Sequence, residues 1–280
     1  MRTIAIVIAL AACGHEPVHG TAFCGEDAPP VDAAPGCRAI MIAGPSNARG
    51  TGSQYELTPG LAYLATPFPD VQEAVHLAKG QAYPVNPPWI DYALSDTQPR
   101  TTWNTTPRFG IELTLARDIA AARPSETWII IKGTVDDTYL ATNWAPSGPL
   151  FDNIHDWFDT QLALSGCAPA VYVDIRGESD SNNATYAAAF GTNYANYAAA
   201  VRARMGALPF VYGRLHIGTA YAHVATVRAG QEGLLVAGAD NHMVDQDPFP
   251  LRTNDLIHFT TTALTDLGHA YATTVLAVAP

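Results

Sequence analysis

The chain has 280 residues, of which 48% are hydrophobic and 15% charged, and its formal net charge is −11. This acidic balance lacks the basic footprint of a nucleic-acid-binding protein, so no nucleic-acid partner is expected. The 12 Tyr, 9 Phe and 5 Trp supply enough apolar surface for a core and exclude a disordered chain. No apolar run reaches the roughly 18 to 20 residues that a membrane-spanning helix needs.

Residues 1–12 are predicted to be a signal peptide. Arg2 supplies a positive charge, and the apolar stretch 4–12 has the length of a secretory signal. The stretch ends in LAAC at Cys13, which resembles the bacterial lipoprotein box, where the cysteine is lipidated. An ordinary signal peptide cut near Ala12 is the alternative, and both interpretations export the protein. With a lipid on Cys13, acyl chains would anchor it in the bacterial cell envelope, on the periplasmic or cell-surface side, without spanning the membrane.

Residues 13–36 are rich in Pro, Gly and Ala and are predicted to be a tether, which leaves 37–280 as the folded domain. Apart from Cys13, the cysteines are Cys24, Cys37 and Cys167, an odd number in a compartment that permits disulfides. We expect Cys24 to pair with Cys37, and an all-reduced chain stays open as the alternative.

The domain alternates apolar runs with helix-length segments. The runs 38–43, 127–132, 170–175, 210–215 and 234–237 are predicted as buried strands. Helices are predicted at 107–122, 151–165, 183–205, 219–231 and 260–275. This order predicts an α/β fold with a parallel sheet covered on both faces. The Pro-rich stretch 51–106 has no clear period and is predicted to be an irregular insertion, a candidate wall of the substrate site.

A turn with the sequence Gly44-Pro45-Ser46-Asn47 follows the first predicted strand. Ligands of such sheets bind at the carboxyl ends of the strands, so Ser46 is placed where a nucleophile is useful. A helix N-terminus there would favour developing negative charge. The alternative is that Ser46 is an ordinary turn residue or helix cap.

Asp255 and His258 precede the last predicted helix. A carboxylate three residues before a histidine can orient the imidazole, whose other nitrogen can take a proton from a serine. Asp266 and His269 have the same spacing, but they fall inside the predicted helix, where such neighbours are common. The loop pair is therefore preferred.

Two further clusters of polar residues are candidate site segments. Arg176, Gly177 and Glu178 follow the third predicted strand and suit an active-site loop, with a solvated turn as the alternative. The acidic run 240–247 could ligate a cation, but it lacks the glycine and terminal glutamate of a calcium loop, so a solvated loop is preferred. No metal site is predicted.

Five motifs in order resemble the sialate O-acetylesterase and acetylxylan esterase group of the SGNH hydrolases, over roughly residues 38 to 278. The motifs are Gly44-x-Ser46-Asn47, Arg108-Phe109-Gly110-Ile111-Glu112, the segment Lys132 to Trp144, Gly177-Glu178-Ser179-Asp180 and Asp255-x-x-His258. The resemblance implies a flavodoxin-like three-layer α/β/α sandwich with a central parallel sheet. It also implies serine-dependent removal of acetyl groups from sugars, without a metal or organic cofactor.

By position, the resemblance makes Ser46 the nucleophile, His258 the general base and Asp255 its orienting carboxylate. The backbone N–H of Ser46 would be the first donor to the oxyanion. The other positions that it assigns to the oxyanion and substrate site are Asn47, Asp137, Thr138, Arg176, Gly177 and Glu178.

The sequence departs from the family at three places in these motifs. Pro45 and Arg176 each stand where members usually have Gln, and Asp136-Asp137 stands where they usually have Gly-Gly. Losing one oxyanion donor costs about 2.7 to 4 kcal/mol of transition-state stabilisation. Arg176 is expected to supply a charged donor, whereas inward-pointing Asp136 or Asp137 side chains would oppose an oxyanion.

The sequence thus predicts an exported, monomeric serine esterase that removes O-acetyl groups from carbohydrate through an acetyl-enzyme. Its partner is the acetylated carbohydrate, and it touches a membrane only through the lipid anchor. Two alternatives stay open. One is a glycan-binding surface lipoprotein of the same fold with weakened catalysis, and the other is an esterase of the same fold acting on a non-sugar ester.

Overall fold

The computed structural model describes residues 36–78, 89–99, 101–103, 106–237 and 240–280. The chain divides into two units, residues 1–31 and 32–280. The predicted signal peptide and the predicted tether up to residue 35, with Cys13 and Cys24, lie outside the described residues. Within the described part of the chain, no helix is both long and apolar enough to cross a membrane.

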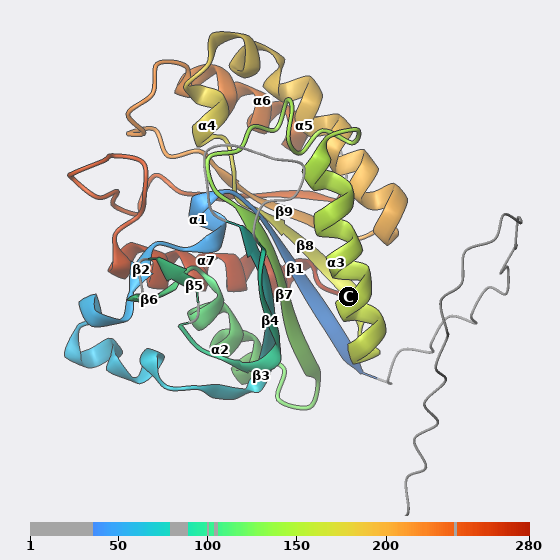
Figure 1. Ribbon diagram of the computed structural model, residues 1–280, viewed down its shortest axis with the longest axis vertical. Coiled ribbons are helices and arrows are strands. Elements are labelled where there is room, and N and C mark those ends of the chain that lie inside the picture. Colours follow the sequence, from blue (N-terminus) through green and yellow to red (C-terminus); the bar gives the residue numbers. More distant parts are fainter. Residues whose placement is uncertain (1–35, 79–88, 100, 104–105, 238–239) are drawn as a thin grey trace, which may run out of the picture. The chain divides into compact units, whose positions relative to one another are not determined.

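The second unit is built on a seven-stranded sheet with the strand order β10-β9-β8-β1-β7-β3-β4 (Figure 1). Neighbouring strands run parallel except for the edge strand β4, which is antiparallel to β3. Four predicted strands correspond to β1, β7, β8 and β9, so the predicted α/β class is confirmed. The strand bounds are β1 Cys37–Gly44, β3 Phe68–Ala78, β4 Trp89–Thr97, β7 Thr127–Val135, β8 Ala168–Asp174, β9 Phe210–Arg214 and β10 Asn241–Asp245.

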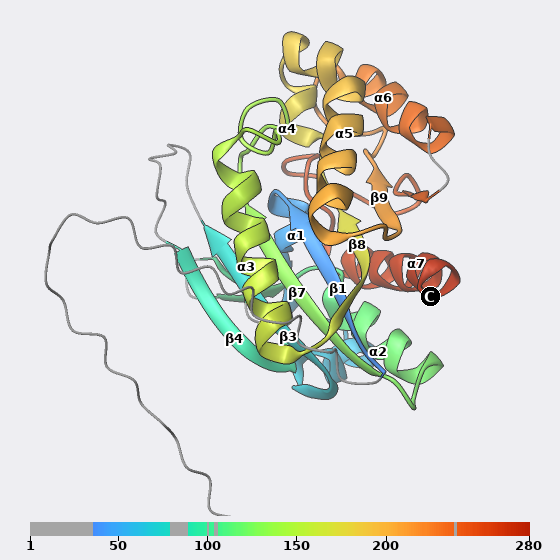
Figure 2. The same cartoon turned by 90° about the vertical axis from the view of Figure 1, so that its right-hand side faces the viewer.

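Helices cover both faces of the sheet (Figures 1 and 2). Residues of α3, α5 and α6 form one core with Met41 of β1, whereas α2 and α7 form the other with Ile40 and Ile42. This alternation follows from the two-residue period of a strand. The predicted three-layer sandwich is confirmed. The helix bounds are α1 Ser46–Arg49, α2 Glu112–Ala122, α3 Pro149–Ser165, α4 Glu178–Ser181, α5 Ala184–Met205, α6 Val224–Ala237 and α7 Thr261–Val278.

The predicted strand at 234–237 is wrong, because these residues form the end of α6. A short apolar run fits a buried helix as well as a strand, and here the helix forms. The strand in this region is β10, which falls in the run taken for an acidic loop. As an edge strand, β10 buries Asn241 and Val244 and leaves Asp245 exposed, so it has no apolar run to detect.

The prediction of an irregular insertion at 51–106 is also wrong. The segment contributes β3 and β4 to the main sheet. It was missed because β3 buries the polar side chains of Glu73 and His76, which interrupt the apolar pattern. Lys132 of β7 lies 3.9 Å from Glu73 and 2.7 Å from Glu112 of α2, so one buried ammonium group compensates part of the charge of two buried carboxylates. The same segment, with residues 107–109 that were predicted as the start of a helix, forms the smaller sheet β2-β6-β5 and two 3₁₀ helices. The bounds are β2 Gly52–Ser53, η1 Gln54–Glu56, η2 Pro59–Ala65, β5 Thr101–Trp103 and β6 Thr106–Phe109.

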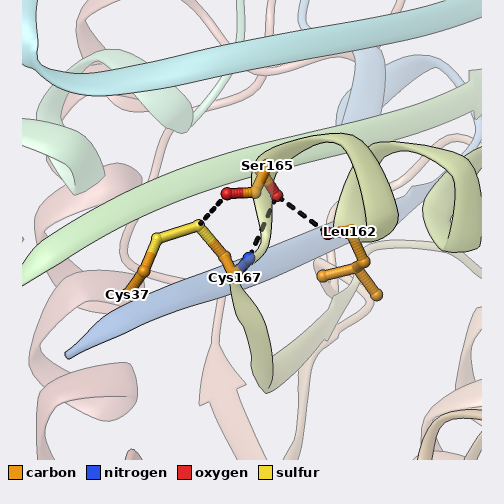
Figure 3. The surroundings of a disulfide bond; sticks show 4 residues. All are labelled: Cys37, Leu162, Ser165 and Cys167. Atoms are coloured by element: carbon orange, nitrogen blue, oxygen red, sulfur yellow. Dashed lines mark hydrogen bonds between the residues drawn. A yellow bond between two sulfur atoms is a disulfide. The ribbon is translucent and has the colours of Figure 1, made fainter. Parts of the chain in front are cut away.

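A disulfide joins Cys37 to Cys167 (Figure 3), so the expected pairing of Cys37 with Cys24 is wrong. Cys37 opens β1, and Cys167 immediately precedes the neighbouring parallel strand β8. Arg38 pairs with Ala168 in the sheet, which brings the two Cα atoms of the cysteines to 4.7 Å. The bond therefore depends on a strand pairing between residues 130 positions apart in the sequence.

Candidate active site

Ser46 is the first residue of α1, and only Pro45 separates it from the end of β1. Gly44 makes this turn possible, because its φ is +135° and a Cβ there would lie 2.1 Å from the carbonyl oxygen of Ile175. The turn therefore packs closely against the segment that follows β8. Ser46 is thus held at the carboxyl end of the sheet, as the sequence predicts.

The structure brings Ser46, His258 and Asp255 into one chain of hydrogen bonds. The Ser46 hydroxyl lies 2.9 Å from Nε2 of His258, across 212 residues of sequence. Nδ1 of His258 lies 2.9 Å from Oδ2 of Asp255. A carboxylate only accepts, so Nδ1 carries the proton and Nε2 is left free to accept from the serine.

The loop that carries Asp255 and His258 is fixed by backbone contacts. Oδ1 of Asp255 accepts hydrogen bonds from the backbone N–H groups of Ile257 at 2.8 Å and His258 at 2.9 Å. Leu256 adopts a left-handed φ of +51°. This conformation is energetically unfavourable for any residue that has a Cβ atom. Burial alone would raise the pKa of Asp255, but the hydrogen bonds from His258 and Ile257 outweigh it and lower that pKa. Asp255 therefore stays ionised beside the imidazole.

The pair Asp266 and His269, which has the same spacing, does not form the corresponding contact, because His269 pairs with another carboxylate. His269 lies on α7 with its Nδ1 2.6 Å from Oδ2 of Asp118 on α2, an exposed contact between two helices. The preference for the loop pair therefore agrees with the geometry.

Asn47 and Glu178 meet beside the nucleophile. The side-chain amide of Asn47 donates to Oε1 of Glu178 at 2.5 Å and to the backbone oxygen of Ile257 at 3.0 Å. Both side chains are buried. Burial raises the pKa of Glu178, and the hydrogen bond from Asn47 partly offsets this. Asn47 thus ties the α1 turn both to α4 and to the loop of His258.

The two carboxylates of the Asp136-Asp137-Thr138 segment do not both point into the site. Asp136 is buried and forms an ion pair of 2.9 Å with Arg49. Asp137 is exposed and has a left-handed φ of +54°, which explains why the family usually has glycine here. Thr138 is structural, since its hydroxyl donates to the Val135 carbonyl at 2.7 Å and accepts from a buried tryptophan.

Arg176 lies in the interior, contrary to the expectation that it supplies a donor to the oxyanion. Its guanidinium donates to both carboxylate oxygens of Asp174, and it stacks on the rings of Trp144 and Tyr197 at 4.5 and 4.3 Å. Its pKa is raised, because Asp174 outweighs the desolvation that alone would lower it. Gly177, with a φ of +127°, follows Arg176 and begins the turn into α4, where Glu178 meets Asn47.

A cavity of about 210 Å³ opens beside the hydrogen-bonded chain. Its lining includes Asp255 and His258 together with Thr51, Arg108 and Arg252. Thr51 and Arg252 belong to none of the motifs in the sequence, and Arg108 was predicted only as part of a family motif. The one available signal was the position of Arg252, three residues before Asp255.

The described residues contain no cluster of three or more His, Cys, Asp or Glu side chains that could hold a metal ion. In the acidic run 240–247, Asp247 forms ion pairs with Arg214 and Arg228, and Asp245 pairs with Arg214. These carboxylates therefore stabilise the β9, β10 and α6 region.

Comparison with protein families gives one match that covers most of the chain. The model of the carbohydrate esterase, sialic acid-specific acetylesterase family matches residues 37–277. The chain belongs to this family. Like other carbohydrate esterases, it is a hydrolase that acts on carboxylic esters. A comparison with the curated proteins found no match.

Solved structures of similar fold include members with related descriptions. A protein from Arabidopsis thaliana superposes with a TM-score of 0.68 at 16% identity, covering 86% of this chain and 98% of its own. NanS superposes with a TM-score of 0.63 at 13% identity, covering 86% of this chain and 97% of its own. A carbohydrate acetylesterase from Xanthomonas citri superposes with a TM-score of 0.58 at 16% identity, covering 86% of this chain and 56% of its own. At these identities, the similarities show that the family fold is shared.

Proposed function

We propose that the protein removes O-acetyl groups from carbohydrate with Ser46, His258 and Asp255 as its catalytic residues. The observation that carries the proposal is the unbroken hydrogen-bonded chain from Ser46 through His258 to Asp255, with both distances at 2.9 Å. Nucleophile and base within 2.6 to 3.2 Å of each other, with the base oriented by a third group, form the arrangement that activates a serine.

In the first half of the reaction, Ser46 Oγ attacks the carbonyl carbon of the acetyl ester while its proton passes to Nε2 of His258. The negative oxygen of the tetrahedral intermediate is stabilised by the backbone N–H of Ser46. As the intermediate collapses, His258 gives the proton to the departing sugar oxygen. The sugar leaves with a free hydroxyl, and the acetyl group stays on Ser46.

In the second half, water attacks the acetyl-enzyme and His258 takes one of its protons. Collapse of the second intermediate releases acetate and returns the proton from His258 to Ser46 Oγ. Asp255 holds Nδ1 of His258 as the donor throughout and stabilises the imidazolium when it forms. Its lowered pKa keeps it charged for this task.

Acetylated carbohydrate is proposed as the substrate because of the family to which the chain belongs. The Xanthomonas citri structure of the same fold is described as a carbohydrate acetylesterase, which points in the same direction. We also propose that the protein is exported, acts as a monomer and is anchored through Cys13. The signal-like residues 1–12 support export, and so does the Cys37–Cys167 disulfide, which suits an oxidising compartment.

Acetate release tests the proposed chemistry. Rates on p-nitrophenyl acetate and on acetylated glycans are compared for the wild type, Ser46→Ala and the control Ser125→Ala. Ser125 is exposed and lies two residues before the start of β7, so its variant changes the same atoms at the opposite edge of the sheet. Loss of several decades of activity in Ser46→Ala alone supports the proposal. Equal, near-background rates in all three proteins would contradict it.

A further inference from the structure

A second cavity adjoins the one beside the triad. Its volume is about 300 Å³, against about 210 Å³ for the first. Arg252 lines both cavities, so the two share this side chain as a common wall. The other residues that line the second cavity are Glu56, Thr253, Asn254, Thr260 and Thr261. All of these side chains are polar, so the second cavity offers hydrogen bonds rather than apolar contact.

The guanidinium of Arg252 lies where the two cavities meet. Its Nη2 donates to the backbone oxygen of Thr51, a residue that lines the first cavity. The same Nη2 lies 3.8 Å from the carboxylate of Glu56, which lines the second cavity. A ligand too long for the first cavity can therefore extend past Arg252 into the second.

One wall of the second cavity belongs to the loop that carries two triad residues. Thr253 and Asn254 directly precede Asp255 in this loop. The backbone N–H of Arg252 donates to the backbone oxygen of His258 at 2.7 Å, which closes the loop on itself. Thr253 and Asn254 are therefore held in position relative to the reacting atoms, and little ordering entropy is lost when a ligand binds there.

The other wall combines η1 with the beginning of α7. The hydroxyl of Thr261, the first residue of α7, donates to Oε2 of Glu56 and accepts from the backbone N–H of Ser53 at 3.1 Å. These contacts hold the Glu56 carboxylate in place, while 54% of its side chain stays exposed. A carboxylate that is both fixed and exposed can accept hydrogen bonds from the hydroxyl groups of a ligand.

Thr253 and Asn254 supply the groups that are free to bind. Both residues are exposed, and neither side chain forms a hydrogen bond within the part of the chain that the structure describes. A hydroxyl and an amide can each donate and accept. The charges of Arg252 and Glu56 are opposite, so the cavity has no excess of one sign that would select an ion. This combination favours a neutral ligand rich in hydroxyl groups.

We propose that the second cavity binds the sugar next to the one whose acetyl ester Ser46 attacks, so that esters within a glycan chain are preferred to esters of a single sugar. Each sugar hydroxyl both donates and accepts, which matches the mixed donors and acceptors of this cavity. Contacts with a remote part of the substrate raise kcat/KM without touching the reacting atoms. This inference rests on the proposed function, and it adds the length of the substrate to it.

The test offers the same acetyl ester on a single sugar and within an oligosaccharide. One pair is an O-acetylated methyl xyloside and xylotriose acetylated at the same hydroxyl of its central unit. The other pair is O-acetylated N-acetylneuraminate, free and as the terminal sugar of sialyllactose. Values of kcat/KM are compared for the wild type, Asn254→Ala and the control Asn196→Ala. Asn196 is exposed on α5, so its variant removes the same amide away from the cavity.

We expect the wild type to favour the oligosaccharide ester over the single-sugar ester in at least one pair by roughly 10- to 100-fold in kcat/KM. Asn254→Ala should reduce this ratio by roughly 3- to 10-fold, because a hydrogen bond to the neighbouring sugar is lost. The ratio cancels any change that the substitution causes at the triad, and in Asn196→Ala it should match the wild type. A wild-type ratio near one in both pairs, in an enzyme that Ser46→Ala inactivates, overturns this inference and leaves the proposed function standing.

A binding measurement keeps the two proposals separate. Ser46→Ala is titrated calorimetrically with unacetylated methyl xyloside, xylotriose, N-acetylneuraminate and sialyllactose, so that no turnover is needed. Tighter binding of an oligosaccharide than of its single sugar, weakened in Ser46→Ala/Asn254→Ala, supports the second sugar site even where catalysis fails. Equal affinity for single sugars and oligosaccharides, or no binding of either, contradicts it.

Discussion

The side chains of Asn47 and Glu178 are joined by a buried hydrogen bond of 2.5 Å across 131 residues of sequence. Asn47 follows the proposed nucleophile, and its amide also holds the backbone oxygen of Ile257, next to His258. One side chain therefore links the turn of Ser46 to the loop that carries the base. We interpret Asn47 as a positioning residue for the Ser46 to His258 distance.

Replacement of this side chain tests the link. Asn47→Ala should lower kcat by roughly 10- to 100-fold with a smaller change in KM, because misplacement by about 1 Å is enough for such losses. It should also cost about 1 to 3 kcal/mol of stability, since Glu178 loses its donor in a buried site. Steady-state kinetics and urea unfolding measure both effects. Asn196→Ala on the exposed face of α5 is the matched control, and a wild-type kcat in Asn47→Ala would refute the positioning role.

Asp255→Asn should abolish most activity while the fold is kept. The Asn oxygen can still accept from the backbone N–H groups of Ile257 and His258, so the loop is retained. Its NH₂ group then faces Nδ1 of His258, which favours the wrong tautomer of the imidazole. A loss in kcat of roughly 10³- to 10⁴-fold is expected, by analogy with the serine protease triad. A variant with more than a tenth of the wild-type rate would show that this carboxylate is dispensable.

The disulfide should contribute strongly to stability. It closes a loop of 130 residues, for which the chain-entropy argument gives about 4 to 5 kcal/mol. The Cys37→Ala/Cys167→Ala variant should therefore unfold at lower urea concentration than the oxidised wild type. Reductant should lower the wild-type midpoint and leave the double variant unaffected. Equal midpoints with and without reductant in the wild type would contradict the prediction.

His155 should make the protein sensitive to mild acid. Burial lowers its pKa to about 4, and its Nδ1 donates to the Phe151 carbonyl at 2.6 Å. An unfolded histidine has a pKa near 6.5, so as the pH falls below that value the unfolded chain takes up a proton that the folded chain refuses. Stability is fully present above pH 6.5 and is lost progressively towards pH 4, by roughly 3 kcal/mol at most.

Urea midpoints between pH 7 and pH 4 test this for the wild type and His155→Gln. Gln does not titrate, so the variant should lose less stability than the wild type across that window. Parallel pH curves for the two proteins would assign the acid sensitivity to other groups.

The triad was accessible from the sequence because its members sit in local motifs. Asp255 and His258 are three positions apart, and Ser46 lies two positions after the glycine that ends a clear apolar strand. In a parallel sheet such loops gather at one edge, so their meeting follows from the fold class. The geometry of Asn47 with Glu178 needed the structure, since neither residue type is specific to such a contact.

Other parts of the site depended on contacts that a sequence does not display. Arg176 was expected to face the oxyanion. Its guanidinium instead forms a buried ion pair with Asp174, two positions earlier in the sequence. Arg108 and Arg252 meet at a backbone oxygen of Thr51, and a carbonyl leaves no side-chain signal. The polar side chains of Glu73 and His76 concealed β3, because their partners lie on other elements.

The strands β1 and β8 are joined by the disulfide at one end and lead to the proposed active site at the other. At the amino end the Cys37–Cys167 bond fastens them covalently, and at the carboxyl end they lead to Ser46 and to Glu178. Substitutions in the loops at the carboxyl ends therefore do not remove the disulfide. Loss of the disulfide, in turn, does not remove any residue of the proposed active site. Substrate preference and durability can be varied separately, either by natural divergence or by grafting loops from relatives onto this sheet.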